Sequence, residues 1–317
     1  MRRVLRMSPP LLIGHADAAH RLDWGDAVAA LRSGHQLPRA EIADSFIGPA
    51  TATMMSRSAY IPGLGYGAKA FTVFDANAAR GLATVQGAML VFAPEDGHVS
   101  AVVDSALVTE FKTAADSVLG ASLLARPDSA HLLVVGAGTV AASLVRAYRA
   151  VMPGLRRVSV WARRPEQAQA LVAGLGDIGA ELVAVPDLAP AVGQADIVSS
   201  ATMARQPVIL GDWVRPGTHV DLIGAYKADM READDALLAK AALFVDSRET
   251  TAHIGELLIP LASGAIRPGD VLGDLYDLVR DGARRRQSQG EITVYKNGGG
   301  AHLDLMMAHY IAGALSS

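Results

Sequence analysis

The chain contains no cysteine, which excludes disulfide bonds, thiolate metal sites and a cysteine nucleophile. Its histidines are scattered without the paired spacing of a metal-binding helix, so no metal site is expected. Aromatic residues make up only 5% and charged residues only 19% of the 317 residues, against 50% hydrophobic residues. This composition argues against long disordered segments, and the length fits two packed domains.

The chain also lacks an excess of positive charge and any long apolar run. Its net charge is -3 and the basic cluster at 284–286 is short, so nucleic acid is not an expected partner. No segment reaches the roughly 18 uninterrupted apolar residues of a spanning helix, so no membrane contact is expected. Pro9, Pro10 and Gly14 interrupt the segment after the N-terminal arginines before a signal-peptide core forms. We therefore expect a cytoplasmic protein.

The first part of the chain predicts an α+β domain with a mixed sheet. Turn-forming residues at 94–97 join two predicted strands into a hairpin, which requires antiparallel pairing. We place this domain at 1–117 and add the C-terminal segment 291–317, whose last strand and helix we expect to pack back on it. The predicted elements are helices at 26–32, 113–125 and 302–313, and strands at 68–73, 83–92, 99–103 and 292–295.

The segment 118–290 predicts a Rossmann domain. Apolar strands alternate with helical or loop segments there, as a doubly wound parallel sheet requires. The predicted fold class is therefore α/β, with a doubly wound parallel sheet and a second α+β domain. The predicted strands of the Rossmann domain lie at 131–135, 158–161, 182–185, 196–200, 219–223 and 242–246.

A glycine turn follows the first of these strands and opens a helix. The run from Gly136 to Ala141 has the form G-x-G-x-x-A. The first glycine permits the tight turn, Gly138 lets the backbone approach a pyrophosphate, and the helix N-terminus favours phosphate. The sequence thus predicts a dinucleotide site with contacts from Gly136, Gly138, Thr139, Val140 and Ala141.

The end of the next strand bears on the choice between NAD and NADP. An acidic residue there would bind the ribose hydroxyls, but this chain has Arg163 and Arg164. A guanidinium pairs well with a phosphate dianion, so NADP(H) is favoured over NAD(H). The alternative is that both arginines belong to a solvated loop.

Several ordered segments make the chain similar to the ornithine cyclodeaminase and mu-crystallin family over nearly its whole length. The order and spacing of the segments carry the resemblance more than any one of them. They are Pro38-Arg39, Gly67 to Val73, Asn77 with Arg80 to Leu82, Thr109 to Ala115, Val134 to Gly138, Gly224-Ala225 with Met230 to Glu232 and Asp234, and Ile292 to Lys296 with Asp304.

The resemblance implies a homodimer in which the first domain and the C-terminal tail bind substrate and contact the partner subunit. The active site would lie between this module and the Rossmann domain. By position, Arg39, Lys69 and Lys112 are similar to the cations that hold the substrate carboxylate, and we predict these three as catalytic residues. Further predicted contacts are Thr113, Ala201 and Thr202 for the cofactor, and Tyr226, Asn297 and Gly298 for the substrate.

The residues themselves agree with this assignment to different degrees. Lys69 interrupts an apolar strand, where a cation requires a partner, and it is also placed to relay a proton to an imine nitrogen. Lys112 is expected at the head of a helix, where a positive charge needs an anion such as a bound carboxylate or Glu110. Arg39 follows a proline in a polar segment, and its alternative is a solvated surface charge.

Two departures from the cyclodeaminase pattern bear on the substrate. Lys112 replaces an arginine, which keeps the charge but loses the bidentate fork. Tyr226 replaces the acidic residue that would manage the ornithine side-chain amine, which argues against ornithine. In the tail, His302 and Asp304 either face the substrate or cap the last helix.

These observations favour an NADPH-dependent ketimine reductase that converts 1-pyrroline-2-carboxylate or 1-piperideine-2-carboxylate to proline or pipecolate. Ornithine cyclodeaminase and an amino-acid dehydrogenase such as alanine dehydrogenase are the alternative enzymes. A ligand-binding protein like mu-crystallin is the non-enzymatic alternative, because a fold does not fix a function.

Overall fold

The computed structural model describes residues 9–316, apart from the side chain of Ala78, so the N-terminal arginines lie outside the described residues. The chain divides into two compact units, Met1–Lys112 with Gly300–Ser317, and Thr113–Gly299. The first unit contains a mixed sheet and the second a parallel sheet, which confirms the predicted fold class. No helix in the described part of the chain is long and apolar enough to cross a membrane.

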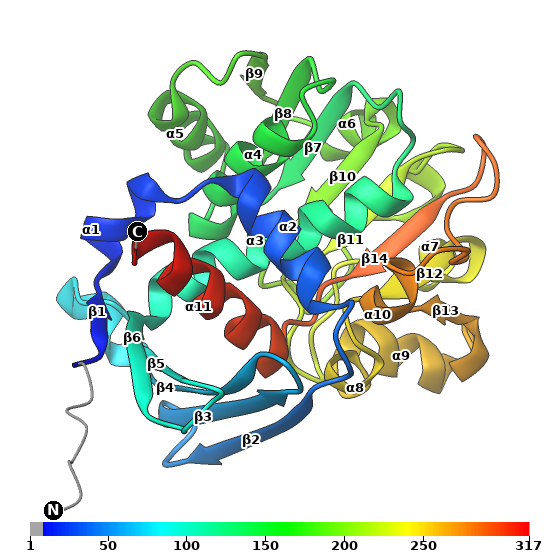
Figure 1. The fold of residues 1–317 in the computed structure, drawn as a ribbon. Helices are drawn as coiled ribbons and strands as arrows, with labels where there is room; N and C mark the ends of the chain where they lie inside the picture. Colours follow the sequence, from blue (N-terminus) through cyan, green and yellow to red (C-terminus); the bar gives the residue numbers. More distant parts are fainter. Residues whose placement is uncertain (1–8, 317) are drawn as a thin grey trace, which may run out of the picture. The chain divides into compact units, whose positions relative to one another are not determined.

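The first unit is built on a six-stranded sheet in the order β1-β6-β5-β4-β3-β2. Strands β2 to β6 pair antiparallel, and β1 adds to β6 in parallel. Figure 1 shows these strands with the C-terminal helix α11 beside them. The elements are β1 (Leu11–Ile13), α1 (His15–Ala18), η1 (Ala19–Arg21), α2 (Trp24–Gly34), β2 (Glu41–Ile47), β3 (Ala52–Ile61), β4 (Gly65–Phe74), η2 (Asp75–Arg80), β5 (Val85–Phe92), β6 (Val99–Asp104) and α11 (Ala301–Leu315).

The core of the first unit lies between one face of this sheet and α11. Helix α11 packs on strands β2 to β6 and on α2. Successive strand residues point to opposite faces, so every second residue of β4 faces α11. Gly67 allows a close approach, because a Cβ there would lie 2.5 Å from Met89 Cε and 2.7 Å from Leu305 Cδ1.

The sequence did not predict β2 and β3. Nearly every residue of β2 is exposed, so its sequence lacks the alternation that marks a half-buried strand. The strand forms because its backbone pairs with β3 along its whole length, from Glu41 opposite Tyr60 to Ile47 opposite Met54.

Helix α3 (Ser105–Leu124) runs through the division between the units. The sequence predicted this helix from residue 113, but it begins directly after β6 at Ser105. Lys112 therefore lies inside the helix, and the dipole argument that placed it at the helix head was wrong.

The second unit is an eight-stranded sheet in the order β13-β12-β14-β11-β10-β7-β8-β9, parallel throughout its described pairings. The elements are β7 (His131–Val135), α4 (Thr139–Val151), β8 (Arg157–Trp161), α5 (Pro165–Leu175), β9 (Glu181–Ala184), α6 (Leu188–Gln194), β10 (Ile197–Ser200), η3 (Gly211–Trp213), β11 (His219–Leu222), α7 (Asp235–Lys240), β12 (Ala242–Val245), α8 (Arg248–Thr251), α9 (Gly255–Ser263), η4 (Pro268–Asp270), β13 (Val271–Gly273), α10 (Leu275–Leu278) and β14 (Thr293–Lys296).

The strand order reverses between β7 and β10, where the chain leaves one half of the sheet and begins the other. In open parallel sheets, ligands bind outside the carboxyl ends of the strands at such a point. The sequence assigned the strand at 292–295 to the first domain, but β14 pairs with β11 and β12 in the second unit. Its four residues are all buried, as a strand in the middle of a parallel sheet requires.

Candidate active site

Two buried lysines of the first unit share one carboxylate. Lys69 is only 4% exposed, and its Nζ donates to Asp304 Oδ1 at 3.1 Å and to Thr109 Oγ1 at 2.5 Å. Lys112 Nζ lies 3.6 Å from the same Asp304 oxygen. Burial of an ammonium group is costly without such partners. The structure thus brings together two of the three predicted carboxylate ligands and adds an anion between them.

Asp304 reaches the lysines because α11 lies over β4 on the face to which Lys69 points. The sequence left open whether Asp304 faces the site or caps the last helix. The N-cap of α11 is Gly300, and no side chain caps this end. Asp304 therefore faces Lys69 and Lys112 and does not cap the helix. The carboxylate of Glu110, the other anion considered for Lys112, lies 2.7 Å from His15 Nε2.

A row of charged side chains crosses the sheet on the face that α11 covers. In the strand register, Asp44 of β2 lies opposite Arg57 of β3, and Arg57 lies opposite Lys69 of β4. The Arg57 guanidinium donates to both Asp44 oxygens, through Nε at 3.1 and 3.2 Å and through Nη2 at 2.9 Å. The next residue in the row is the fully buried Met89 of β5. The sequence reasoning missed Arg57, because β3 was not predicted.

The neighbouring charges of the site shift the pKa values of Asp304 and Lys69. Burial alone would raise the pKa of Asp304, but Lys112, Lys69 and Arg57 outweigh it and hold the pKa at about 2. Burial lowers the pKa of Lys69 from its ordinary value, and Asp304 partly opposes the change. Asp304 is therefore ionised at every pH at which the protein would work.

His302 and Arg39 complete the predicted residues of the first unit. His302 is buried in α11 edge-on to His35, at 5.5 Å between ring centroids. Burial holds the pKa of His302 well below its ordinary value, so the ring is neutral. Arg39 is exposed just before β2, and its part in carboxylate binding stays a prediction.

The glycine turn of the second unit has the geometry of a dinucleotide site. Gly136 has φ +121°, and a Cβ there would lie 2.7 Å from the carbonyl oxygen of Ala201. The turn after β7 therefore passes too close to the end of β10 for a residue with a side chain, at the point where the strand order reverses. Gly138 is the N-cap of α4, and a Cβ there would meet no atom within 4 Å. This open space suits a pyrophosphate.

The other predicted cofactor residues surround this turn. Thr139 and Val140 form the first turn of α4, while Ala141 is fully buried, as close packing of helix on strand requires. Arg163 and Arg164 are exposed at the carboxyl end of β8, and Arg164 is the N-cap of α5. These residues fit a phosphate-bearing cofactor, which would supply a hydride when bound.

Glu232 fastens the carboxyl ends of two neighbouring strands together. Its Oε1 accepts from Ser200 Oγ at 2.7 Å and from the backbone N–H of Thr202 at 2.7 Å, and its Oε2 accepts from Gly224 N at 2.5 Å. A Cβ at Gly224 would collide with the Thr202 carbonyl oxygen, so this approach requires glycine. Thr202, predicted to contact the cofactor, is therefore held beside Gly224, and Tyr226, predicted to contact the substrate, lies two residues further along the chain. Tyr226 is about half exposed there.

A third lysine lies buried in the second unit. Lys296 Nζ donates to the carbonyl oxygens of Leu222 at 3.0 Å and Ile223 at 3.2 Å. Its ammonium is balanced electrostatically by four buried carboxylates, those of Asp221, Glu232, Asp246 and Glu256. Burial raises the pKa of both Asp221 and Glu256 to about 7.

Hydrogen bonds within the second unit hold three further predicted site residues, Asn297, Gly298 and Thr113. Asn297 Nδ2 donates to the Thr113 carbonyl oxygen at 3.0 Å and to Ser117 Oγ at 2.9 Å. The backbone N–H of Gly298 donates to Asp246 Oδ2 at 2.9 Å. These bonds fix the turn after β14, and they give the predicted substrate residues Asn297 and Gly298 a structural role in the chain itself.

Comparison with known proteins shows which enzymes this chain is similar to. The chain is 75% identical over 308 residues to the Delta(1)-pyrroline-2-carboxylate reductase of Paracoccus denitrificans, covering 97% of this chain and 98% of the relative. A solved structure of Thermococcus litoralis Delta(1)-pyrroline-2-carboxylate reductase, in complex with NADH and L-proline, matches with a TM-score of 0.89 and 25% identity. That match covers 96% of this chain and 97% of the other.

An archaeal alanine dehydrogenase, solved as a dimer with bound NAD, matches with a TM-score of 0.89 and 26% identity over 96% of this chain and 95% of that one. The model of the ornithine cyclodeaminase/mu-crystallin family matches residues 52–317. This match confirms the family that the sequence motifs predicted. From its fold, its glycine turn and these likenesses together, the chain belongs to the ornithine cyclodeaminase/mu-crystallin family.

Proposed function

We propose that this chain is an NAD(P)H-dependent reductase of cyclic α-imino acids, with 1-pyrroline-2-carboxylate and 1-piperideine-2-carboxylate as substrates and proline and pipecolate as products. The observation that carries the proposal is the pair Lys69 and Lys112, which share the single carboxylate of Asp304. Two buried cations with one buried anion leave an excess of positive charge, and a substrate carboxylate would balance it.

The residues of the first unit fix the substrate, and those of the second hold the cofactor. Lys69 and Lys112 would hold the carboxylate of the substrate, and a reduced nicotinamide would supply the hydride when bound. The lowered pKa of Lys69 also suits a group that exchanges a proton during the reaction. The likeness to a named pyrroline-2-carboxylate reductase and to a structure with NADH and L-proline supports this assignment.

The test is direct. Purified protein is mixed with NADPH or NADH and each cyclic imine, and the loss of reduced-cofactor absorbance is followed. Turnover with at least one ring is expected. If neither ring is reduced with either cofactor, the proposal is wrong.

Two other enzymes are separated by their substrates. Ornithine cyclodeaminase would release ammonia from ornithine, but Tyr226 lacks the carboxylate that this chemistry needs at its position. An alanine dehydrogenase would reduce pyruvate in the presence of ammonia. Competition between pyruvate with ammonia and the cyclic imine ranks the two acceptors.

We propose NADP(H) as the preferred cofactor. Arg163 and Arg164 are exposed at the end of β8, where a ribose phosphate would lie. Changing both to alanine should raise KM for NADPH by roughly tenfold and leave KM for NADH nearly unchanged. Equal KM values of the unchanged protein for the two cofactors would contradict the preference.

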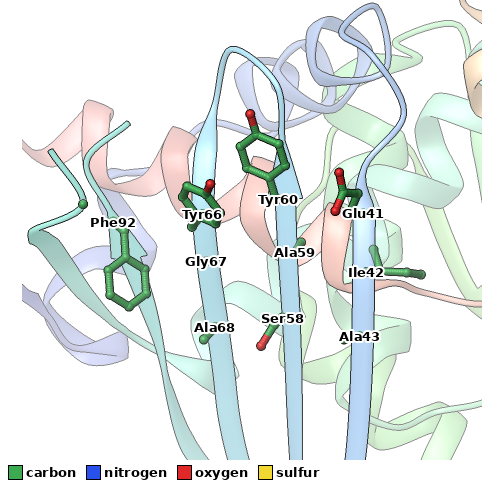
Figure 2. A pocket seen from close by; sticks show the side chains of 11 residues that line it. Glu41, Ile42, Ala43, Ser58, Ala59, Tyr60, Tyr66, Gly67, Ala68 and Phe92 are labelled. Atoms are coloured by element: carbon green, nitrogen blue, oxygen red, sulfur yellow. The ribbon is translucent and has the colours of Figure 1, made fainter. Parts of the chain in front are cut away.

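We also propose that the protein is a homodimer joined through the sheet face that α11 does not cover. Figure 2 shows Tyr60, Tyr66 and Phe92 on this face, where they line an open groove of about 550 Å³. The two tyrosine rings stack at 4.5 Å, and Tyr66 is 53% exposed. Small residues such as Ala68 and Ser58 lie beside them in the groove and leave room for side chains of a second sheet.

The oligomeric state is measured by sedimentation equilibrium. A dimer is expected, and Tyr66→Arg should shift it toward monomer, because the charge would be buried without a partner. A monomeric unchanged protein would contradict the proposed homodimer.

A further inference from the structure

The two oxygens of the Asp304 carboxylate differ in their hydrogen bonds within the described residues. Asp304 Oδ1 accepts a hydrogen bond from Lys69 Nζ at 3.1 Å and lies 3.6 Å from Lys112 Nζ. Asp304 Oδ2 is buried and accepts no hydrogen bond from any group in the described part of the chain. A buried charged oxygen without a donor is costly, so native structures rarely keep one without a reason.

The electrostatics of the site define what this oxygen needs. Lys112, Lys69 and Arg57 hold the pKa of Asp304 at about 2, so the carboxylate is ionised and Oδ2 can only accept. The titratable neighbour on its own helix is His302, which is neutral because burial depresses its pKa. An N–H or O–H donor of a bound ligand would complete the hydrogen bonds of this oxygen.

The proposed substrate has such a donor in one protonation state only. The nitrogen of a neutral cyclic imine carries a lone pair and would repel the carboxylate. The protonated imine carries an N–H and a positive charge, and it is also the better acceptor of hydride.

We propose that Asp304 is a catalytic residue whose Oδ2 accepts a hydrogen bond from the ring N–H of the protonated imine, while the lysines hold the carboxylate of the same substrate. The inference rests on the proposed function. The imine nitrogen takes a proton from solvent, and the hydride then adds to the imine carbon. The π electrons of the C=N bond become the nitrogen lone pair, so the secondary amine forms with its N–H still facing Oδ2.

Two planar ligands that differ at one ring atom test this contact. Pyrrole-2-carboxylate has an N–H next to its carboxylate-bearing carbon, and furan-2-carboxylate has an oxygen there. Their dissociation constants are measured on the enzyme saturated with cofactor. We expect the pyrrole to bind roughly 10- to 100-fold more tightly, because it alone donates a hydrogen bond to a charged group. Equal affinities would overturn the proposal.

Asp304→Asn isolates the oxygen. Asparagine keeps the size of the side chain, and its oxygen will turn toward the lysines, which places an NH₂ donor at the position of Oδ2. The preference for the pyrrole should then disappear or reverse. A preference that survives in Asp304→Asn would overturn the proposal, because both ligands carry the carboxylate that the lysines bind.

Two further variants separate the contact from general damage. Lys112→Met should weaken both ligands by a similar factor and leave their ratio unchanged. Asp304→Glu keeps an anionic acceptor and should retain a preference for the pyrrole, so the ratio remains informative if the asparagine variant folds poorly. Loss of the preference in Lys112→Met but not in Asp304→Asn would overturn the proposal, because the preference would then not depend on the carboxylate of Asp304.

The outcome also distinguishes this inference from the proposed function. If the protein reduces a cyclic imine but binds both ligands equally, the proposed function stands and the proposed role of Asp304 is wrong. If the protein reduces neither imine and binds neither ligand, both the proposed function and the proposed role of Asp304 are wrong.

Discussion

Each unit of this chain buries lysine ammonium groups among carboxylates, but the two clusters have opposite charge balance. In the first unit, Lys69 and Lys112 share Asp304, so positive charge exceeds negative charge. In the second unit, the single ammonium of Lys296 faces four buried carboxylates. The same residue types thus produce two kinds of site.

The difference shows in how each cluster is satisfied. The carboxylates around Lys296 accept hydrogen bonds from the chain, as Glu232 does from Ser200, Thr202 and Gly224. Their remaining excess of charge is relieved by protons, because the pKa of Glu256 is raised to about 7. In the first cluster the one carboxylate, Asp304, is already ionised, so a second anion is needed to balance the second lysine. A cluster satisfied by its own chain is structural, whereas one that lacks an anion and a donor is suited to a ligand.

The largest expected effect is on catalysis by the first cluster. Lys69→Ala should lower kcat/KM by roughly 100- to 1,000-fold, because it removes a charge that positions the substrate. Cofactor affinity, measured by quenching of protein fluorescence, should change by less than about twofold. Arg267→Ala is the control, because its side chain is 86% exposed and pairs with Asp270 on the surface. Equal losses of turnover and cofactor affinity would mean that Lys69 does not act on the substrate.

The second cluster should respond through stability. Lys296→Met leaves four buried carboxylates without their cation, and the free energy of unfolding should fall by about 3 kcal/mol. Urea denaturation measures the change. Lys69→Met should cost clearly less, because Lys112 still faces Asp304. A larger loss for Lys69→Met would contradict the distinction between the two clusters.

The two glycines of the cofactor turn should separate folding from binding. Gly136→Ala should destabilise the protein by roughly 1 to 3 kcal/mol, since its φ is +121° and its Cβ would crowd the Ala201 oxygen. Gly138→Ala should leave stability within about 0.5 kcal/mol, because its Cβ would meet open space. Both should weaken cofactor binding by roughly tenfold, as titration with the reduced cofactor would measure. Normal cofactor binding by Gly138→Ala would contradict the assignment of that space to the pyrophosphate.

The smallest effect concerns pH. Between about pH 5 and 7 the folded chain keeps protons on Asp221 and Glu256 that the unfolded chain has released, because burial raises both pKa values to about 7. The free energy of unfolding should therefore fall as the pH rises through this window, by on the order of 1 kcal/mol per pH unit.

Urea denaturation at several pH values measures this slope, and Glu256→Gln should reduce it. Asp304 behaves in the opposite sense. Its pKa of about 2 lies below the unfolded value, so its stabilising contribution is lost only as the pH falls below about 4. Asp304→Asn should therefore leave the slope between pH 5 and 7 unchanged, and a slope that disappears in this variant would contradict the comparison.

The sequence by itself determined the features that depend on neighbours along the chain. The turn from Gly136 to Ala141 was predictable because a strand, two glycines and a helix follow one another directly. Lys69 was recognisable because a cation in an apolar strand requires a partner. The alternation of strands with helices predicted the parallel sheet of the second unit, except for β13, which was not predicted, and β14, which was assigned to the first domain.

Tertiary structure alone decided which partners those residues meet. Asp304 lies 235 residues from Lys69 and reaches it only because α11 packs on β4. The strand pairing that aligns Arg57 with Lys69 depends on β2 and β3, whose exposed residues carry no clear alternation. Contacts between distant segments arise from which faces of helices and strands bury each other, and local sequence patterns specify the faces but not their partners.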